Sequence, residues 1–66
     1  MKVEINGVAH DLADEATVAD ALTAIDAPET GIAVAVDGQV VRRADWTSTR
    51  LAAGVAVEVL TAVQGG

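Results

Sequence analysis

The sequence predicts an α+β domain in which a mixed sheet of four or five strands packs on one helix. Three observations support this. A short alternating segment that ends in Asn-Gly opens the chain, a single amphipathic segment follows, and two apolar, β-branched runs come after it. Runs of that kind are typical of central strands, and one helix with one apolar stripe needs one sheet face to cover it. A chain of 66 residues has room for one small core.

The first predicted element is a β-hairpin. Residues 2–6 alternate polar and apolar side chains, as half-buried strands do. Asn6-Gly7 predicts a type I′ turn, because both central residues of that turn need φ > 0. Residues 8–12 are then expected to form the returning strand.

A helix is predicted after the hairpin. Thr17 is expected to cap it, with Asp20 as the capping-box partner three residues on. The apolar residues at helical spacing are Val18, Ala21, Leu22 and Ile25. Ala27-Pro28 is expected to end the helix, because proline disfavours the αR conformation in the residue before it.

Three further strands complete the prediction. Residues 32–36 form a continuously apolar run, as expected of a buried central strand. An Asp-Gly turn leads to a short strand over residues 39–42, and one helical turn is expected at residues 44–46. The last strand spans residues 55–61, with Val at alternate positions. Elements in this order form a β-grasp fold, as in ubiquitin.

Charge and cysteine content exclude several classes of function. The formal net charge is −6, from ten acidic and four basic residues, whereas nucleic-acid binding requires a basic patch. The same charge disfavours an anionic membrane surface, and no apolar run approaches the ~18 residues of a membrane-spanning helix. Without cysteine there is no disulfide framework and no thiolate zinc site. We therefore expect a cytoplasmic protein that binds neither nucleic acid nor membrane.

The sequence ends in Gly65-Gly66. Glycines lack Cβ atoms, so such a segment can enter a narrow channel and leave the terminal carboxylate open to attack. We expect a folded domain over residues 1–62 and an extended, flexible tail over residues 63–66. A frayed end without a role is the alternative.

The whole chain resembles the ThiS family, the sulfur carrier proteins of thiamine biosynthesis. The resemblance rests on the Asn-containing first turn, the Thr17-Val18 helix start, the segment VVRRADW at residues 40–46 and the terminal Gly65-Gly66. Its most specific parts are the Arg-x-x-Trp spacing within that segment and the diglycine directly after the last strand.

The resemblance implies a carrier and not an enzyme. An E1-like adenylyltransferase (ThiF) would use ATP and Mg²⁺ to convert the Gly66 carboxylate to an acyl-adenylate. A sulfur donor fed by a cysteine desulfurase would displace AMP and leave a thiocarboxylate, and thiazole synthase (ThiG) would accept the sulfur. Gly65 would keep the tail slender, and Val63 and Gln64 would contact the partner's channel. The chain itself would bind no cofactor and no metal.

Other residues are assigned to docking or to structure. Val57, Val59 and Leu60 are expected to form a docking surface on an apolar exposed part of the sheet. Trp46 is expected to plug the edge of the core, with a docking role as the alternative. His10, the only histidine, is expected on the surface of the early hairpin.

Three alternative functions fit the same terminus. A molybdopterin sulfur carrier (MoaD-like) would share the fold and the activation chemistry. A ubiquitin-like protein modifier would use the same adenylate and join Gly66 to lysine side chains. In an interaction module, the diglycine would have no role at all.

Overall fold

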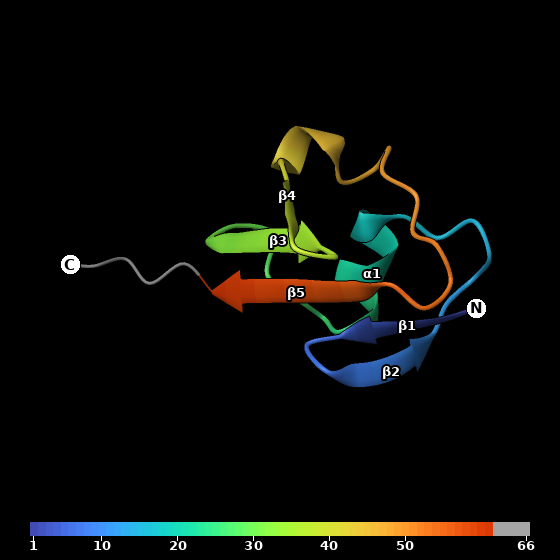
Figure 1. The fold of residues 1–66 in the computed structure, drawn as a ribbon. Helices are drawn as coiled ribbons and strands as arrows, with labels where there is room; N and C mark the ends of the chain where they lie inside the picture. Colours follow the sequence, from blue (N-terminus) through green and yellow to red (C-terminus); the bar gives the residue numbers. More distant parts are fainter. Residues whose placement is uncertain (62–66) are drawn as a thin grey trace.

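The computed structural model describes residues 1–61 and shows a five-stranded mixed sheet with one α-helix on one face (Figure 1). The strand order is β2-β1-β5-β3-β4. The elements are β1 (Lys2–Ile5), β2 (Val8–Asp11), α1 (Val18–Ala24), β3 (Ile32–Val36), β4 (Gln39–Val41), the 3₁₀ helix η1 (Arg43–Asp45) and β5 (Ala56–Thr61). The predicted α+β class and β-grasp arrangement are confirmed. Among the described residues, no helix is long and apolar enough to cross a membrane.

The last strand in sequence lies at the centre of the sheet. β5 pairs in parallel with β1, with Glu4 opposite Ala56 and Ile5 opposite Val57. On its other side it pairs antiparallel with β3, from Val57 opposite Val36 to Thr61 opposite Ile32. Figure 1 shows β5 between these two neighbours. The ladder with β1 covers only the start of β5, whereas the ladder with β3 anchors the strand as far as Thr61.

Both hairpins turn through two residues with positive φ. Asn6 and Gly7 have φ of 52° and 82°, and they connect β1 to β2. Asp37 and Gly38 have φ of 49° and 85°, and they connect β3 to β4. Positive φ at both central residues defines the type I′ turn, whose twist matches that of the flanking strands. The predicted Asn-Gly hairpin is confirmed, and the Asp-Gly turn is of the same kind.

The core lies between the sheet and α1. Its fully buried side chains come from β1, β3, β5 and the helix, joined by Leu51 from the loop before β5. The buried hydrophobic residues are Val3, Ile5, Ala16, Val18, Ala21, Leu22, Val34, Leu51 and Val57. All are aliphatic, so the core is built from small and β-branched side chains, and the half-buried Trp46 packs against its edge.

The start of α1 is fully hydrogen-bonded. The Asp20 amide donates to Thr17 Oγ1 at 3.4 Å, and the Asp20 carboxylate accepts from the Thr17 amide at 2.9 Å, which confirms the predicted capping box. The amides of Val18 and Ala19 donate to the carbonyls of Thr49 and Trp46, each at 3.0 Å. The loop between η1 and β5 therefore supplies acceptors that a helix start otherwise lacks.

The end of α1 differs from the prediction. The helix stops at Ala24, and Asp26 adopts a left-handed conformation with φ of 55°. The Ala27 amide donates to the Leu22 carbonyl at 2.9 Å, and the Asp26 amide donates to the Thr23 carbonyl at 3.1 Å. These two bonds form a Schellman motif. The motif reverses the chain before the proline, so Pro28 follows the end of the helix and does not cause it.

Candidate functional site

The predicted sulfur-carrying end of the chain lies outside the described residues. This applies to Gly66 and to the tail residues Gly65, Gln64 and Val63. The structure places the strand that precedes them, because β5 ends at Thr61. The candidate site is therefore built from the end of β5 and the surface around it.

The predicted docking residues divide between the two faces of the sheet. Val57 is only 1% exposed and belongs to the core, so its assignment to an exposed docking surface is wrong. Val59 is half-buried and packs against the same core. Leu60 is 62% exposed on the opposite face. Side chains alternate between faces along a strand, so three neighbouring apolar residues of β5 do not all reach one surface.

A second exposed apolar side chain shares the outer face with Leu60. Leu60 lies opposite Ala33 of β3, and Val40 of β4 lies opposite Ala35 of β3. Val40 is 77% exposed. Since Ala33 and Ala35 are two residues apart on one strand, all four side chains point to the same face. This outer face is defined by Leu60, Val40, Ala33 and Ala35, and it also carries the exposed Glu58, which lies opposite Ala35.

Val40 was not among the docking residues predicted from the sequence. A signal for it was present, because Val40 and Val41 are adjacent on one short strand and must point to opposite faces. Val41 is half-buried against the core, and Val40 is directed to solvent. Which of the two faces outward depends on the pairing of β4 with β3, and the local sequence does not specify that pairing.

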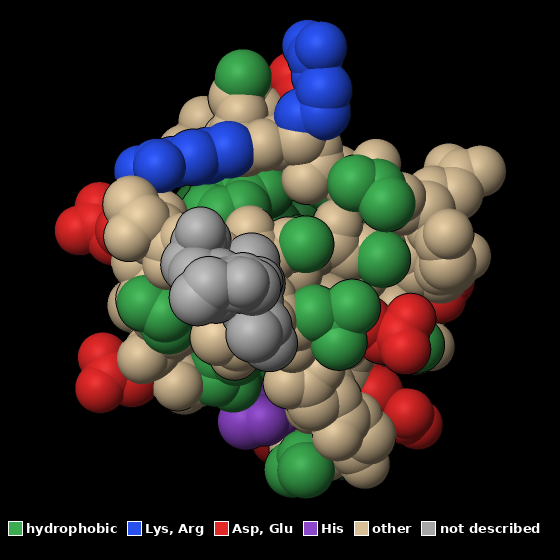
Figure 2. Space-filling model, turned by 90° about the vertical axis from the view of Figure 1, so that its left-hand side faces the viewer, with side chains coloured by type: hydrophobic (Ala, Val, Ile, Leu, Met, Phe, Trp, Pro, Cys, Tyr) green, Lys and Arg blue, Asp and Glu red, His purple; other side chains and the backbone are tan. Residues whose placement is uncertain are grey.

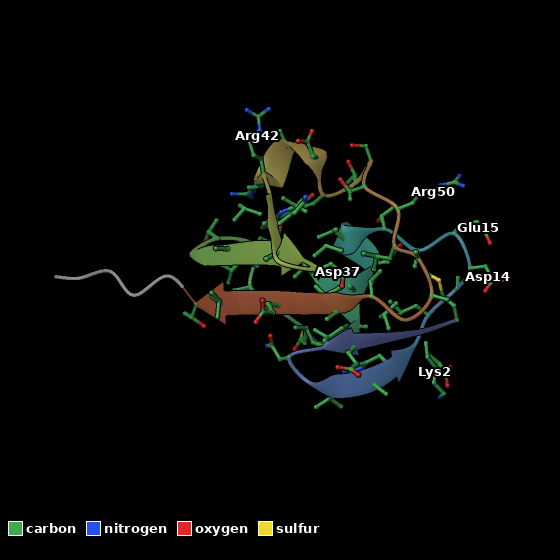
Figure 3. The ribbon with its side chains drawn as sticks, in the orientation of Figure 1. Lys2, Asp14, Glu15, Asp37, Arg42 and Arg50 are labelled. Carbon is green, nitrogen blue, oxygen red and sulfur yellow. The ribbon has the colours of Figure 1, made fainter. Side chains whose placement is uncertain are left out.

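Some of the basic side chains lie at the end of the molecule where β5 ends. In Figure 2, the Lys and Arg side chains visible on this end gather along one edge, while hydrophobic side chains occupy its middle. Figure 3 places Arg42 next to β4, and Arg50 far from it beside Asp14 and Glu15. Arg42 Nε lies 3.7 Å from the Asp45 carboxylate. The four basic residues thus do not form one continuous patch of the kind that binds nucleic acid.

The other polar and aromatic side chains of interest lie far apart or have structural contacts. His10 is half-buried on the edge strand β2, and Ser48 Oγ donates to the Asp45 carbonyl beyond β4, at the other edge of the sheet. Within residues 1–61, no group of three or more acidic or histidine side chains is arranged to hold a metal ion. Trp46 Nε1 donates to the Val41 carbonyl at 3.0 Å, which supports its predicted role as a plug at the core edge.

Two turn residues contact the backbone of β5 with their side chains. Asn6 Oδ1 accepts from the Val59 amide at 2.8 Å, and Asn6 Nδ2 donates to the Val59 carbonyl at 3.2 Å. Asp37 Oδ1 accepts from the Ala56 amide at 2.9 Å. Asp37 therefore supports the start of β5, and Asn6 supports the part that leads to the candidate site. Neither contact was predicted from the sequence.

Comparisons with known proteins agree with this architecture. The model of the ThiS family matches residues 3–66, a range that includes the terminal diglycine. The fold is similar to the crystal structure of a thiamine biosynthesis protein (ThiS) from Geobacter metallireducens, with a TM-score of 0.83 and 28% sequence identity over 100% of both chains. A search of curated protein sequences gives no match. Because the family match spans nearly the whole sequence and the full-length fold agrees with it, the chain belongs to the ThiS family.

Proposed function

We propose that this chain is a sulfur carrier of thiamine biosynthesis that carries sulfur as a thiocarboxylate on Gly66. The observation that carries the proposal is the family match over residues 3–66, which includes both the β-grasp domain and the diglycine. The similar fold of the Geobacter metallireducens protein supports the thiamine branch. In this role the chain is a substrate of other enzymes and not an enzyme itself.

The chemistry requires activation of the carboxylate by a partner. A carboxylate is a poor electrophile, so an adenylyltransferase of the ThiF type would join the Gly66 carboxylate to the α-phosphate of ATP and release pyrophosphate. A sulfide nucleophile then attacks the acyl carbon, the C–S bond forms, and AMP leaves with the oxygen. The sequence has no cysteine thiol that could carry the sulfur instead, which supports the proposed thiocarboxylate on Gly66. A thiazole synthase of the ThiG type would then accept it.

We infer that the outer face of the sheet docks the adenylating partner. Leu60 lies near the end of β5, the strand that leads to Gly66 in the sequence. Val40 lies on the same face, two strands away. Exposed large apolar side chains on a sheet face favour burial against a partner. The exposed Glu58 lies opposite Ala35 on the same face, and Arg42 beside it is paired with Asp45. An apolar partner surface with a basic group opposite Glu58 would match it.

Intact-protein mass spectrometry tests the proposed function. The chain is incubated with the adenylyltransferase, ATP·Mg²⁺ and a sulfide source, and we expect a mass increase of one oxygen-to-sulfur exchange in the terminal peptide. The matched control is the same chain without Gly66, which should not gain this mass. An unchanged mass, with an adenylyltransferase that is active on a known carrier, would contradict the proposal.

Mass spectrometry of the chain recovered from cell lysate, together with the proteins that co-purify with it, separates the rival functions. A free thiocarboxylate supports a carrier, whereas isopeptide-linked adducts at Gly66 would support a protein modifier. Co-purification with thiazole synthase supports the thiamine branch, and co-purification with molybdopterin synthase would support the MoaD-like branch.

A further inference from the structure

We propose that Asn6 is a positioning residue, which fixes the C-terminal part of β5 for the reaction at the Gly66 carboxylate. This inference rests on the proposed function, and it assigns a role in that function to a residue that lies far from the C-terminus in the sequence. Asn6 lies 53 positions before Val59, the residue that its side chain contacts. Residues 60 and 61 complete β5 after that contact, and residues 62–66 follow directly in the sequence.

The Asn6 side chain extends the ladder between β1 and β5. The Asn6 backbone amide donates to the Val57 carbonyl at 2.9 Å, which is the last backbone contact on this side. The side-chain amide then binds both the N–H and the C=O of Val59, at 2.8 Å and 3.2 Å. A primary amide carries one acceptor and two donors, so it satisfies both groups of Val59 as a further strand residue would.

This contact is needed because β1 is shorter than β5 on the shared side. The type I′ turn bends the chain away after Ile5, whereas β5 continues to Thr61. β3 supports β5 on the other side as far as the pair of Ile32 with Thr61. The Asn6 side chain therefore extends the support of β5 on this side from Val57 to Val59, two residues before the strand ends. A strand that is held on both sides as far as Val59 has a more sharply defined direction where it leads toward its end.

Turn chemistry alone does not account for asparagine at this position. A type I′ turn accepts Asn, Asp or Gly at its first central residue, and the second hairpin uses Asp37 there. A carboxylate accepts hydrogen bonds and does not donate them when ionised. The Asp37 side chain accordingly only accepts, from the Ala56 amide. The paired contact at Val59 requires a side chain that donates and accepts, and asparagine is the turn-forming residue that does both.

The structural half of the proposal is tested by amide hydrogen exchange, measured by NMR. Asn6→Gly keeps a residue that adopts positive φ and removes the side chain. We expect the ratio of the Val59 exchange rate to the Leu60 exchange rate to rise about tenfold, because the Val59 amide loses its acceptor. The Leu60 amide is the internal reference, since successive amides of a strand alternate in direction and that of Leu60 is directed to β3. The matched control is Asp37→Gly, which removes the other turn side chain from β5 and should leave this ratio unchanged. A wild-type ratio in Asn6→Gly would overturn the proposal.

A second variant tests the need for a donor. Asn6→Asp retains the turn and the acceptor for the Val59 amide, but sets a carboxylate oxygen against the Val59 carbonyl. We expect the Val59-to-Leu60 exchange ratio to rise in this variant as well. A ratio equal to that of the wild type would show that the acceptor alone is sufficient, and would overturn the argument for asparagine.

The functional half is tested by steady-state adenylation with the adenylyltransferase and ATP·Mg²⁺. Docking through the outer face is intact in Asn6→Gly, so we expect KM for the chain to stay within about twofold, while a misdirected terminus lowers kcat about tenfold. Asp37→Gly should change neither constant. If the wild-type chain is not adenylated, the proposed function itself fails. If it is adenylated and Asn6→Gly retains the wild-type kcat, the positioning role alone fails.

Discussion

The indole Nε1 of Trp46 donates a 3.0 Å hydrogen bond to the backbone carbonyl of Val41, the last residue of β4. The backbone carbonyl of Trp46 in turn accepts from the Ala19 amide in the first turn of α1. One residue thus connects the edge of the sheet to the start of the helix. Replacement of Trp46 therefore tests both packing and hydrogen bonding at the core edge.

We predict that Trp46→Phe lowers the free energy of unfolding by about 1 kcal/mol, because the ring is retained and the hydrogen bond to Val41 is lost. Trp46→Ala also loses the ring's contacts with the core, and should lower it by about 3 kcal/mol. Urea unfolding followed by far-UV circular dichroism measures both values. Equal losses in the two variants would show that the ring contributes no packing energy.

The capping box of α1 predicts a coupled pair of substitutions. Thr17→Ala and Asp20→Ala should each lower the free energy of unfolding by about 1 kcal/mol, since each removes one of the reciprocal contacts. The double variant should lose less than the sum of the two, because both contacts belong to one motif. Thr30→Ala, at an exposed position outside the helix, is the control. Strict additivity in urea unfolding would contradict the capping box.

The left-handed residue that ends α1 predicts a stabilising change. Asp26→Gly should raise the free energy of unfolding by up to about 1 kcal/mol, because glycine adopts a φ of 55° without the steric cost of a Cβ. Glu29→Gly is the control, since its φ is not positive and glycine there only increases the entropy of the unfolded chain. Thermal unfolding of both variants measures the difference. A lower melting temperature for Asp26→Gly than for the wild type would contradict the assigned motif.

The two faces of β5 predict opposite outcomes for two apolar truncations. Val57→Ala should lower the free energy of unfolding by about 2 kcal/mol, from lost burial and the cavity that remains. Leu60→Ala should change it by less than about 0.5 kcal/mol, because this side chain is largely exposed. Urea unfolding compares them directly. Similar losses in both variants would mean that the faces are assigned incorrectly.

The proposed docking face predicts a change in partner affinity without a change in stability. Leu60→Asp and Val40→Asp should each raise KM for adenylation at least about tenfold, because a charge would be buried against the partner. Val8→Asp is the matched control, since Val8 is 59% exposed and lies on the edge strand β2, away from the outer face. A similar rise in KM for Val8→Asp would attribute the effect to net charge and not to the docking face.

Local chemistry allowed much of the fold to be predicted. Asn6-Gly7 specified a type I′ hairpin because the conformations that the turn requires are open to those two residues. Thr17 and Asp20 specified the helix start because a capping box needs only residues three positions apart. The end of α1 was less predictable, because the Schellman motif at Asp26 uses a residue type that tolerates positive φ without demanding it. The terminal Gly65-Gly66 by itself left a frayed end as the alternative, and it indicated the ThiS family only in combination with the predicted fold.

The sequence by itself thus determined the turns, the helix start, the identity of the strands and the family. The tertiary structure decided which side of each strand faces solvent, so that Val57 lies in the core while Leu60 and Val40 lie on the outer face. It also decided the contact of Asn6 with Val59. The physical reason is the separation in sequence between the residues that interact. Capping and turn conformations depend on neighbours a few residues away, whereas strand pairing and contacts across 53 residues depend on how the whole chain buries its apolar surface.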